Sequence, residues 1–334
     1  MLDPYIRQKI LPEIGEEGQK KLGKKTVLIA GCGALGTNTA EALLRAGVKH
    51  LVLVDRDVVE VHNLHRVSLF FPEDLGRPKA LAAKERLQEI DPEAQIDCYV
   101  AHLDSKLAEE LVPKVNLVAD GLDNLETRYV LNDACVKYGK PWIYTAVLAT
   151  YGLIMPILPE KGPCLRCLFP NPPRPGTIPT CAEAGILGTV PKVLASLQAT
   201  TALAILLESP DAKPGELFYF DVWRRRTQTV QVQRAKDCPT CVGKDFQFLL
   251  RESPRTATLC GDSIQILPRE RARLDLASLA QRLSRVGKAE VKSGVLFAEL
   301  EGLSFTVFPD GRAIIKGVSD PNRAQALYDQ FIAR

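Results

Sequence analysis

The stretch LIAGCGALG, residues 28–36, decides the fold because it joins an apolar run to three glycines spaced Gly31-x-Gly33-x-x-Gly36. This spacing is typical of the turn between a buried strand and a helix that receives a phosphate at its N-terminus. The first glycine permits the turn, the second leaves room for the phosphate, and the third lets helix and strand pack closely. Asp55 ends the next apolar run, where a carboxylate can hold ribose hydroxyls. The motif predicts a bound nucleotide without separating NAD from other adenosine nucleotides.

Strand and helix patterns alternate on either side of this turn. Short apolar runs are followed by amphipathic segments, which predicts right-handed βαβ units and a mostly parallel sheet. The predicted strands are 26–30, 50–54, 95–100, 116–119 and 141–146, and the predicted helices are 38–46, 79–90 and 125–138. We therefore expect an α/β fold with a Rossmann-like nucleotide-binding domain.

The pattern changes after Tyr151. Residues 159–180 form a long loop rich in Pro and Gly, an apolar helix is expected over 190–208, and 216–232 alternates like a β-hairpin. The remaining chain has its own strands and helices. The predicted domains are 1–248, which carries the glycine turn, and 249–334, a small α+β domain to which the sequence assigns no role.

Charged residues after the second strand indicate which nucleotide is bound. The loop after the second strand carries Asp57, Asn63 and Arg66. Lys79 opens the next predicted helix, and Asp120 and Asp123 follow a later strand. The carboxyl ends of parallel strands share one edge of the sheet, so these side chains are expected to meet there. Basic groups neutralise phosphates and carboxylates bind Mg²⁺, so the set favours a triphosphate with a metal ion. Each residue alone is more often a solvated surface charge, but the whole set in this order favours the nucleotide site.

Taken together, these features resemble the ubiquitin-activating-enzyme (E1)-like family, the MoeB/ThiF/HesA group of adenylyltransferases. The resemblance rests on YIRQKIL, GCGALG, LVDRDVVEVHNLHR, GRPKA, DGLDNLETRYVLNDAC, CLRC, TCAEAGILG, SLQATTAL and CPTC, in family order across about residues 5–243. It implies an enzyme that uses ATP to adenylate the C-terminal glycine of a ubiquitin-like sulfur carrier of the MoaD/ThiS type, with release of pyrophosphate. The carrier would end in Gly-Gly, and a sulfur donor protein would be a further partner.

The resemblance also implies site residues. Those that match the family's nucleotide, phosphate and Mg²⁺ positions are Gly31, Gly33, Gly36, Asp55, Asp57, Asn63, Arg66, Lys79 and Asp123. Arg66, Lys79 and Asp123 would be catalytic, and so would Arg7, which in the family reaches into the partner subunit's site and implies a homodimer. The sequence departs from the family at Val67, where the family usually has Gln, so one polar contact at the phosphates is missing.

The cysteines indicate a metal site. Cys164 and Cys167 form one C-x-x-C pair, and Cys238 and Cys241 form another about 70 residues later. Four thiolates suit a closed tetrahedral Zn²⁺ site, and the resembling family uses this split spacing. A redox role is the alternative, but the expected thioredoxin-like pattern is absent. Cys181 stands alone in the long loop. The resemblance implies that it links covalently to the activated carrier or accepts sulfur, and a free loop cysteine is the alternative.

Composition narrows the function classes. The chain has 43 basic and 40 acidic residues, a net charge of +3, which argues against a broad nucleic-acid-binding face. The apolar stretch 199–207 is much shorter than the roughly 20 residues that span a bilayer. Nine cysteines without an apolar leader segment favour a reducing compartment, so a cytoplasmic location is expected.

Three alternatives to the carrier adenylyltransferase remain. One is ATP-dependent activation of another acid, as in a tRNA threonylcarbamoyladenosine dehydratase-like enzyme. A second is an NAD-dependent oxidoreductase, which leaves Arg66, Lys79 and the cysteine pairs unexplained. The third is a non-catalytic scaffold with a zinc site, against which the retained charged residues argue.

Overall fold

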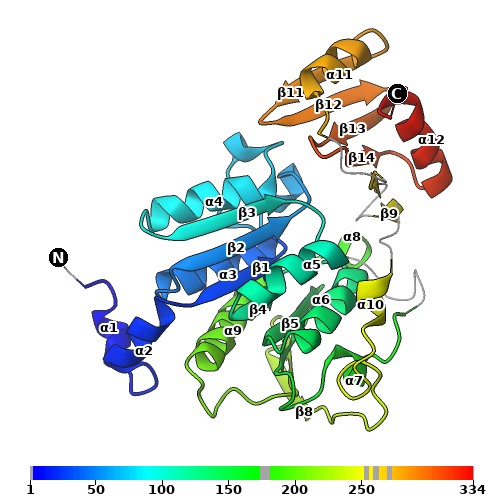
Figure 1. Ribbon diagram of the computed structural model, residues 1–334. Helices are drawn as coiled ribbons and strands as arrows, with labels where there is room; N and C mark the ends of the chain where they lie inside the picture. Colours follow the sequence, from blue (N-terminus) through cyan, green and yellow to red (C-terminus); the bar gives the residue numbers. More distant parts are fainter. Residues whose placement is uncertain (1–2, 174–180, 252–255, 259–262, 269–272, 334) are drawn as a thin grey trace. The chain divides into compact units, whose positions relative to one another are not determined.

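The computed structural model describes residues 3–173, 181–251, 256–258, 263–268 and 273–333, without the side chains of residues 181, 182, 257 and 258. Contacts divide the chain into two compact units, Met1–Arg251 and Glu252–Arg334 (Figure 1). The sequence placed the boundary after residue 248. Each unit has its own sheet and its own core, and the glycine turn lies in the first.

The first unit is built on an eight-stranded sheet in the order β3-β2-β1-β4-β5-β6-β7-β8. Pairing is parallel from β3 to β5 and antiparallel from β5 to β8. The strands are β1 (Thr26–Ala30), β2 (His50–Asp55), β3 (Gln95–Val100), β4 (Leu117–Asp120), β5 (Trp142–Leu148), β6 (Tyr151–Ile157), β7 (Glu216–Asp221) and β8 (Arg226–Gln231). The strand order reverses between β1 and β4, and the carboxyl ends of strands at such a switch point are where open α/β sheets bind ligands.

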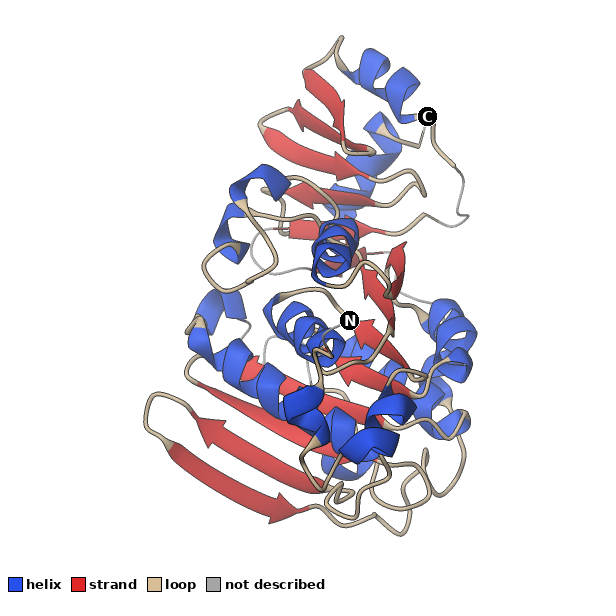
Figure 2. Ribbon diagram, turned by 90° about the vertical axis from the view of Figure 1, so that its left-hand side faces the viewer, coloured by secondary structure: helices blue, strands red, loops and turns tan. Residues whose placement is uncertain are grey.

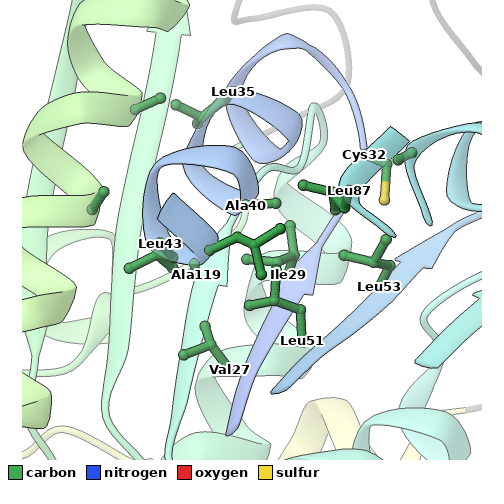
Figure 3. Close-up of a cluster of buried hydrophobic side chains, with 14 of the residues drawn as sticks. Val27, Ile29, Cys32, Leu35, Ala40, Leu43, Leu51, Leu53, Leu87 and Ala119 are labelled. Carbon is green, nitrogen blue, oxygen red and sulfur yellow. The ribbon is translucent and has the colours of Figure 1, made fainter. Parts of the chain in front are cut away.

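Helices cover both faces of this sheet. Alternate residues of β1 enter two separate cores, with Val27 and Ile29 on one face and Leu28 and Ala30 on the other. Figure 3 shows the first core, in which side chains of β1 and β2 meet Leu43 and Leu87 from two covering helices. The helices of the unit are α1 (Ile6–Lys9), α2 (Gly15–Leu22), α3 (Ala34–Arg45), α4 (Lys79–Ile90), α5 (Ser105–Leu111), α6 (Leu125–Lys137), α7 (Leu165–Leu168), α8 (Cys181–Ala184), α9 (Thr189–Leu206) and α10 (Gln247–Leu250).

Several elements differ from expectation, and α5 is one that was not predicted. Helix α3 begins at Ala34, four residues before the predicted start. The prediction began too late because glycine is normally unfavourable inside a helix, whereas Gly36 lies inside this one. Strand β6 was not predicted and forms a hairpin with β5. Among the described residues, one helix, α9, is long and apolar enough to cross a membrane. Half of it is buried inside the fold, and buried core helices pass the same test.

The second unit is a small α+β structure with an antiparallel sheet in the order β11-β12-β13-β14-β10-β9. Its core joins this sheet to both of its helices, and Phe305 on the sheet packs against Phe331 on the last helix. Figure 2 draws the strands of this sheet in red and the helices in blue. The elements are β9 (Thr256–Thr258), β10 (Ser263–Ile266), α11 (Leu276–Leu283), β11 (Lys288–Lys292), β12 (Val295–Leu300), β13 (Leu303–Val307), β14 (Ala313–Lys316) and α12 (Pro321–Phe331). Gly311, with a φ of +85°, lies in the turn between β13 and β14.

Candidate active site

The glycine turn between β1 and α3 packs backbone against backbone with the loop that follows β4. Gly31 has a φ of +94°, and a Cβ on Gly36 would lie 1.8 Å from the carbonyl oxygen of Gly31. A Cβ on Gly121 would lie 2.4 Å from the same oxygen. Gly33, the N-cap of α3, differs from these glycines. If the two neighbouring residues are left out, the nearest atom to a Cβ placed on Gly33 would be the carbonyl oxygen of Gly121, at 4.0 Å. The fold therefore requires Gly31 and Gly36, whereas Gly33 leaves space at a helix N-terminus, as a ligand-facing position would.

Asp55, the last residue of β2, connects this turn to the next loop. Its Oδ2 accepts a hydrogen bond from the backbone N–H of Cys32 at 2.6 Å, and its Oδ1 accepts one from the N–H of Asp57 at 2.7 Å. Burial raises the pKa of Asp55 above its ordinary value, and the charge of Lys79 opposes that shift. Each carboxylate oxygen keeps a further lone pair, so Asp55 can brace the turn and still accept a hydroxyl.

Lys79 opens α4, as predicted, and points toward three acids. Its backbone N–H donates to the carbonyl of Asp57 at 2.9 Å, and its Nζ lies 3.2 Å from Oδ2 of the same residue. Burial alone lowers the pKa of Lys79, but the carboxylates of Asp57, Asp55 and Asp123 raise it above its ordinary value. The result is a fixed positive charge beside the glycine turn.

Arg56 is a member of the cluster that sequence reasoning missed. Its guanidinium lies 3.8 Å from Oδ1 of Asp57 through Nε and 3.8 Å from Oδ1 of Asp123 through one terminal nitrogen. It also contacts Nδ1 of His102 at 3.2 Å. Arg56 therefore connects the loop after β2 with the loop after β4. The signal in the sequence was its place between two acids in the DRD stretch.

Asn63 and Arg66 lie on the loop between β2 and α4. Asn63 is buried in a 3₁₀ turn, η1 (Val61–Asn63), and its Oδ1 accepts the backbone N–H of Glu60 at 3.0 Å. The N–H of Arg66 donates to the carbonyl of Asn63 at 3.1 Å, and its guanidinium donates to the carbonyl of His62. Asn63 thus braces the segment that carries Arg66. Val67, where the family usually has Gln, is buried in the core.

Arg7 lies away from these residues. It is exposed on α1, and the side chain of its neighbour Gln8 donates to the carbonyl of Ala46, at the end of α3, at 2.8 Å. Helix α3 has 12 residues and is therefore about 18 Å long, so α1 lies at the far end of α3 from Gly33. Arg7 does not join the cluster of its own chain.

The four predicted metal ligands meet in space. The sulfurs of Cys164 and Cys238 are 3.5 Å apart, those of Cys167 and Cys241 are also 3.5 Å apart, and all four lie within 4.8 Å of one another. Four thiolates around one tetrahedral Zn²⁺ would be about 3.8 Å apart. The backbone N–H of Ala235 donates to Cys167 at 3.4 Å. The geometry fits a tetrahedral metal ion that joins α7 to the segment after β8.

Helix α6 holds both cysteine pairs through two adjacent buried side chains. Oδ1 of Asn132 accepts the backbone N–H of Leu165, inside the first pair, at 2.8 Å. Asp133 accepts the hydroxyl of Thr240, inside the second pair, at 3.0 Å, and the N–H of Phe248 at 2.9 Å. Neither residue was assigned a role from the sequence, although both stand in the LNDAC part of the DGLDNLETRYVLNDAC stretch. Cys181 begins α8, but its side chain lies outside the described residues.

A glycine turn at a topological switch point, with a buried lysine and three acids beside it, defines a nucleotide-binding enzyme domain. Residues 5–240 match the ThiF family. The chain is 42% identical to the sulfur carrier protein adenylyltransferase of Thermus thermophilus, over 78% of this chain and 97% of that protein. It is 37% identical to the sulfur carrier protein ThiS adenylyltransferase of Bacillus subtilis, over 99% of this chain and 100% of that protein. This chain belongs to the ThiF family of E1-like adenylyltransferases.

The comparisons also bear on the fold and on the second unit. A crystal structure of MccB from E. coli superposes with a TM-score of 0.61, covers 72% of this chain and 75% of that one, and is 20% identical. At that identity the likeness concerns the fold alone. Because the Bacillus subtilis relative aligns over almost the whole chain, the second unit also has a counterpart in that protein.

Proposed function

We propose that this enzyme uses ATP to adenylate the C-terminal glycine of a ubiquitin-like sulfur carrier of the MoaD/ThiS type and releases pyrophosphate. The observation that carries the proposal is the charged Lys79 held among Asp55, Asp57 and Asp123 beside the glycine turn. The names of the relatives in Thermus thermophilus and Bacillus subtilis support the same activity.

The chemistry needs positioning and charge neutralisation rather than a general base. A carboxylate oxygen of the carrier's last glycine attacks the α-phosphorus, a new C–O–P linkage forms, and the bond to the bridging oxygen of the β-phosphate breaks. The leaving pyrophosphate takes the electron pair. Lys79 and Arg66 would neutralise phosphate charge as it develops, Asp55 would hold the ribose, and Asn63 would keep the Arg66 loop in place.

Asp123 is the residue that we assign to Mg²⁺. Its side chain is 51% exposed, unlike that of the buried Asp120, so its carboxylate is open to a bound nucleotide. A hard divalent cation favours carboxylate and phosphate oxygens, and it would offset charge on the pyrophosphate. Arg56 and Lys79 would hold the carboxylates of this cluster until metal and nucleotide arrive.

We assign Zn²⁺ to the four cysteines, with a structural role. A closed set of four thiolates leaves no position for a substrate. Asn132 and Asp133 hold the backbone and side chains around the ligands, as outer residues of zinc sites commonly do.

We assign the enzyme to a homodimer in which Arg7 serves the partner's site. Arg7 is exposed and cannot join its own cluster, and three apolar side chains around it are also exposed. Ile6 is 59% exposed, Ile10 68% and Leu11 48%, which suits a surface covered by a second copy.

The carrier and a sulfur donor complete the expected partners. A hollow of about 530 Å³ beside the β7–β8 turn is lined by Tyr151, Leu187 and Trp223, and Trp223 is 71% exposed. Exposed aromatic groups of this kind suit a protein partner. Cys181 would attack the acyl-adenylate through its thiolate, so that a thioester forms and AMP leaves. Alternatively, its thiolate would take the outer sulfur of a persulfide on the donor protein, and the donor's thiol would leave. Free thiols in the described part of the chain fit a cytoplasmic location.

ATP–pyrophosphate exchange tests the proposal directly. Exchange should require a carrier that ends in Gly-Gly and should vanish when the last glycine is removed. Cys181→Ala should leave exchange intact and abolish any covalent carrier adduct. Absence of exchange with every Gly-Gly carrier, together with turnover of a modified tRNA, would replace the proposal by the dehydratase-like alternative, which the names of the relatives do not favour.

A further inference from the structure

The backbone on both sides of Asp123 is fixed, although the side chain itself is exposed. On one side, the N–H of Leu122 donates to Oδ1 of Asp120 at 2.9 Å. On the other, Asn124 caps α6, since its Oδ1 accepts the N–H of Thr127 at 2.9 Å. The acid that we assign to Mg²⁺ therefore stands on a short loop held at each end.

One buried arginine on α6 organises the first of these attachments. The Nε of Arg128 donates to Oδ2 of Asp120 at 2.9 Å. One terminal nitrogen of Arg128 donates to the carbonyl of Leu122 at 2.6 Å and to the carbonyl of Thr145, on β5, at 2.8 Å. The guanidinium thus joins the end of β4, the residue before Asp123 and the neighbouring strand.

The arrangement is specific to a guanidinium. A lysine could keep a charge next to Asp120, but its single nitrogen cannot also bind the two carbonyls in a fixed fork. The carbonyl of Asp120 is held separately, by Nε2 of Gln198 at 2.9 Å, so β4 keeps its place when Arg128 changes. Loss of the fork would therefore free chiefly Leu122 and the residue after it.

We propose that Arg128 is a positioning residue for the metal step, because it fixes the loop that aims the carboxylate of Asp123 at nucleotide-bound Mg²⁺. The inference rests on the proposed function only in assigning the metal to Asp123. Arg128 itself touches neither nucleotide nor metal and acts through Leu122. Substituting a residue that supports a metal ligand without touching the metal typically weakens metal affinity by about 10- to 100-fold.

The test measures how tightly the full-length enzyme binds Mn²⁺, a probe for Mg²⁺, in the presence of a non-hydrolysable ATP analogue. The electron paramagnetic resonance signal of free Mn²⁺ reports the unbound fraction. Arg128→Lys should weaken Mn²⁺ binding about tenfold and leave analogue binding without metal unchanged. Amide hydrogen exchange at residues 121–124 should rise in the same variant. In a double-mutant cycle, Arg128→Lys should add no further loss to Asp123→Asn, because it acts through that residue.

Arg312→Lys is the matched control, since Arg312 is also buried, pairs with Asp310 at 2.7 Å and lies over Phe308, but belongs to the second unit. It should leave Mn²⁺ affinity unchanged. Should Arg128→Lys fail to fold, Asn124→Ala opens the other end of the loop. This change removes the cap of α6 and the 3.2 Å hydrogen bond from Nδ2 of Asn124 to Oδ1 of Asp123, so it should weaken Mn²⁺ binding and raise amide exchange at residues 121–124.

Two results separate the possible failures. If Asp123→Asn weakens Mn²⁺ binding while Arg128→Lys and Asn124→Ala do not, or if the double-mutant losses add, Arg128 has only a structural role and the inference is wrong. If Asp123→Asn itself leaves Mn²⁺ binding unchanged, the metal assignment in the proposed function is wrong.

Discussion

The ammonium of Lys79 lies 3.2 Å from the carboxylate of Asp57, inside a loop closed by a backbone hydrogen bond between the same two residues. The carboxylates around Lys79 hold its pKa above the ordinary value despite burial. A raised pKa means that the charge of Lys79 contributes stability below about pH 10.4 and that this contribution is lost as pH rises through the folded value. Across the physiological range Lys79 is therefore charged, as the proposed contact with a phosphate requires.

Asp57→Asn should change the pH dependence of ATP binding. Without the carboxylate of Asp57, the pKa of Lys79 loses one of the charges that raise it against burial, and it falls toward the value that Asp55 and Asp123 alone support. ATP affinity, measured at equilibrium by titration calorimetry, should then decline at a lower alkaline pH than in the wild type, by about one pH unit. Lys79→Ala serves as the reference, because it should bind ATP weakly with no such decline. An identical alkaline decline in wild type, Asp57→Asn and Lys79→Ala would show that another group titrates.

The glycine turn offers a matched pair of substitutions. In Gly36→Ala the new methyl would meet the carbonyl of Gly31 at 1.8 Å, so the unfolding free energy should fall by about 3 kcal/mol or more. In Gly33→Ala the methyl has room, so stability should change by no more than about 0.5 kcal/mol. Urea unfolding and ATP titration on the same samples separate the two effects.

Gly33→Ala should nevertheless weaken ATP binding, because the methyl occupies the space at the N-terminus of α3. Wild-type ATP affinity in a normally folded Gly33→Ala protein would mean that the phosphates lie elsewhere.

Asp133→Ala should loosen the cysteine cluster. The substitution leaves the hydroxyl of Thr240 and the N–H of Phe248 without their buried acceptor, which costs about 2 to 4 kcal/mol. Zinc, followed by a colorimetric chelator, should be released about tenfold faster than from the wild type. Asp104→Ala removes the cap of α5 in the same unit and should cost about 1 kcal/mol without altering zinc release. Equal zinc release from Asp133→Ala and wild type would remove Asp133 from the metal site.

The elements around the glycine turn were predictable from the sequence because periodicity and chain order fix them locally. The bounds of β1 and α4 agree with the structure, and Lys79 stands where the GRPKA stretch placed it. Contacts across the sheet were not predictable in the same way. The fork of Arg128 joins three segments, and Arg56 gains a role only when the loops after β2 and β4 meet. Such residues look like ordinary charges until the topology brings their partners together.

Arg7 permits a test of the dimer by complementation. If Arg7 serves the partner's site, a mixed dimer of Arg7→Ala and Asp123→Asn chains contains one site with both defects and one with neither. Co-expression in equal amounts gives mixed dimers as half of the population, so pyrophosphate exchange should recover to about a quarter of the wild-type level. The matched control pairs Arg66→Ala with Asp123→Asn. Both residues serve the site of their own chain, so each site of the mixed dimer keeps one defect and no recovery is expected. Recovery in both pairs, or in neither, would contradict the assignment of Arg7 to the partner's site.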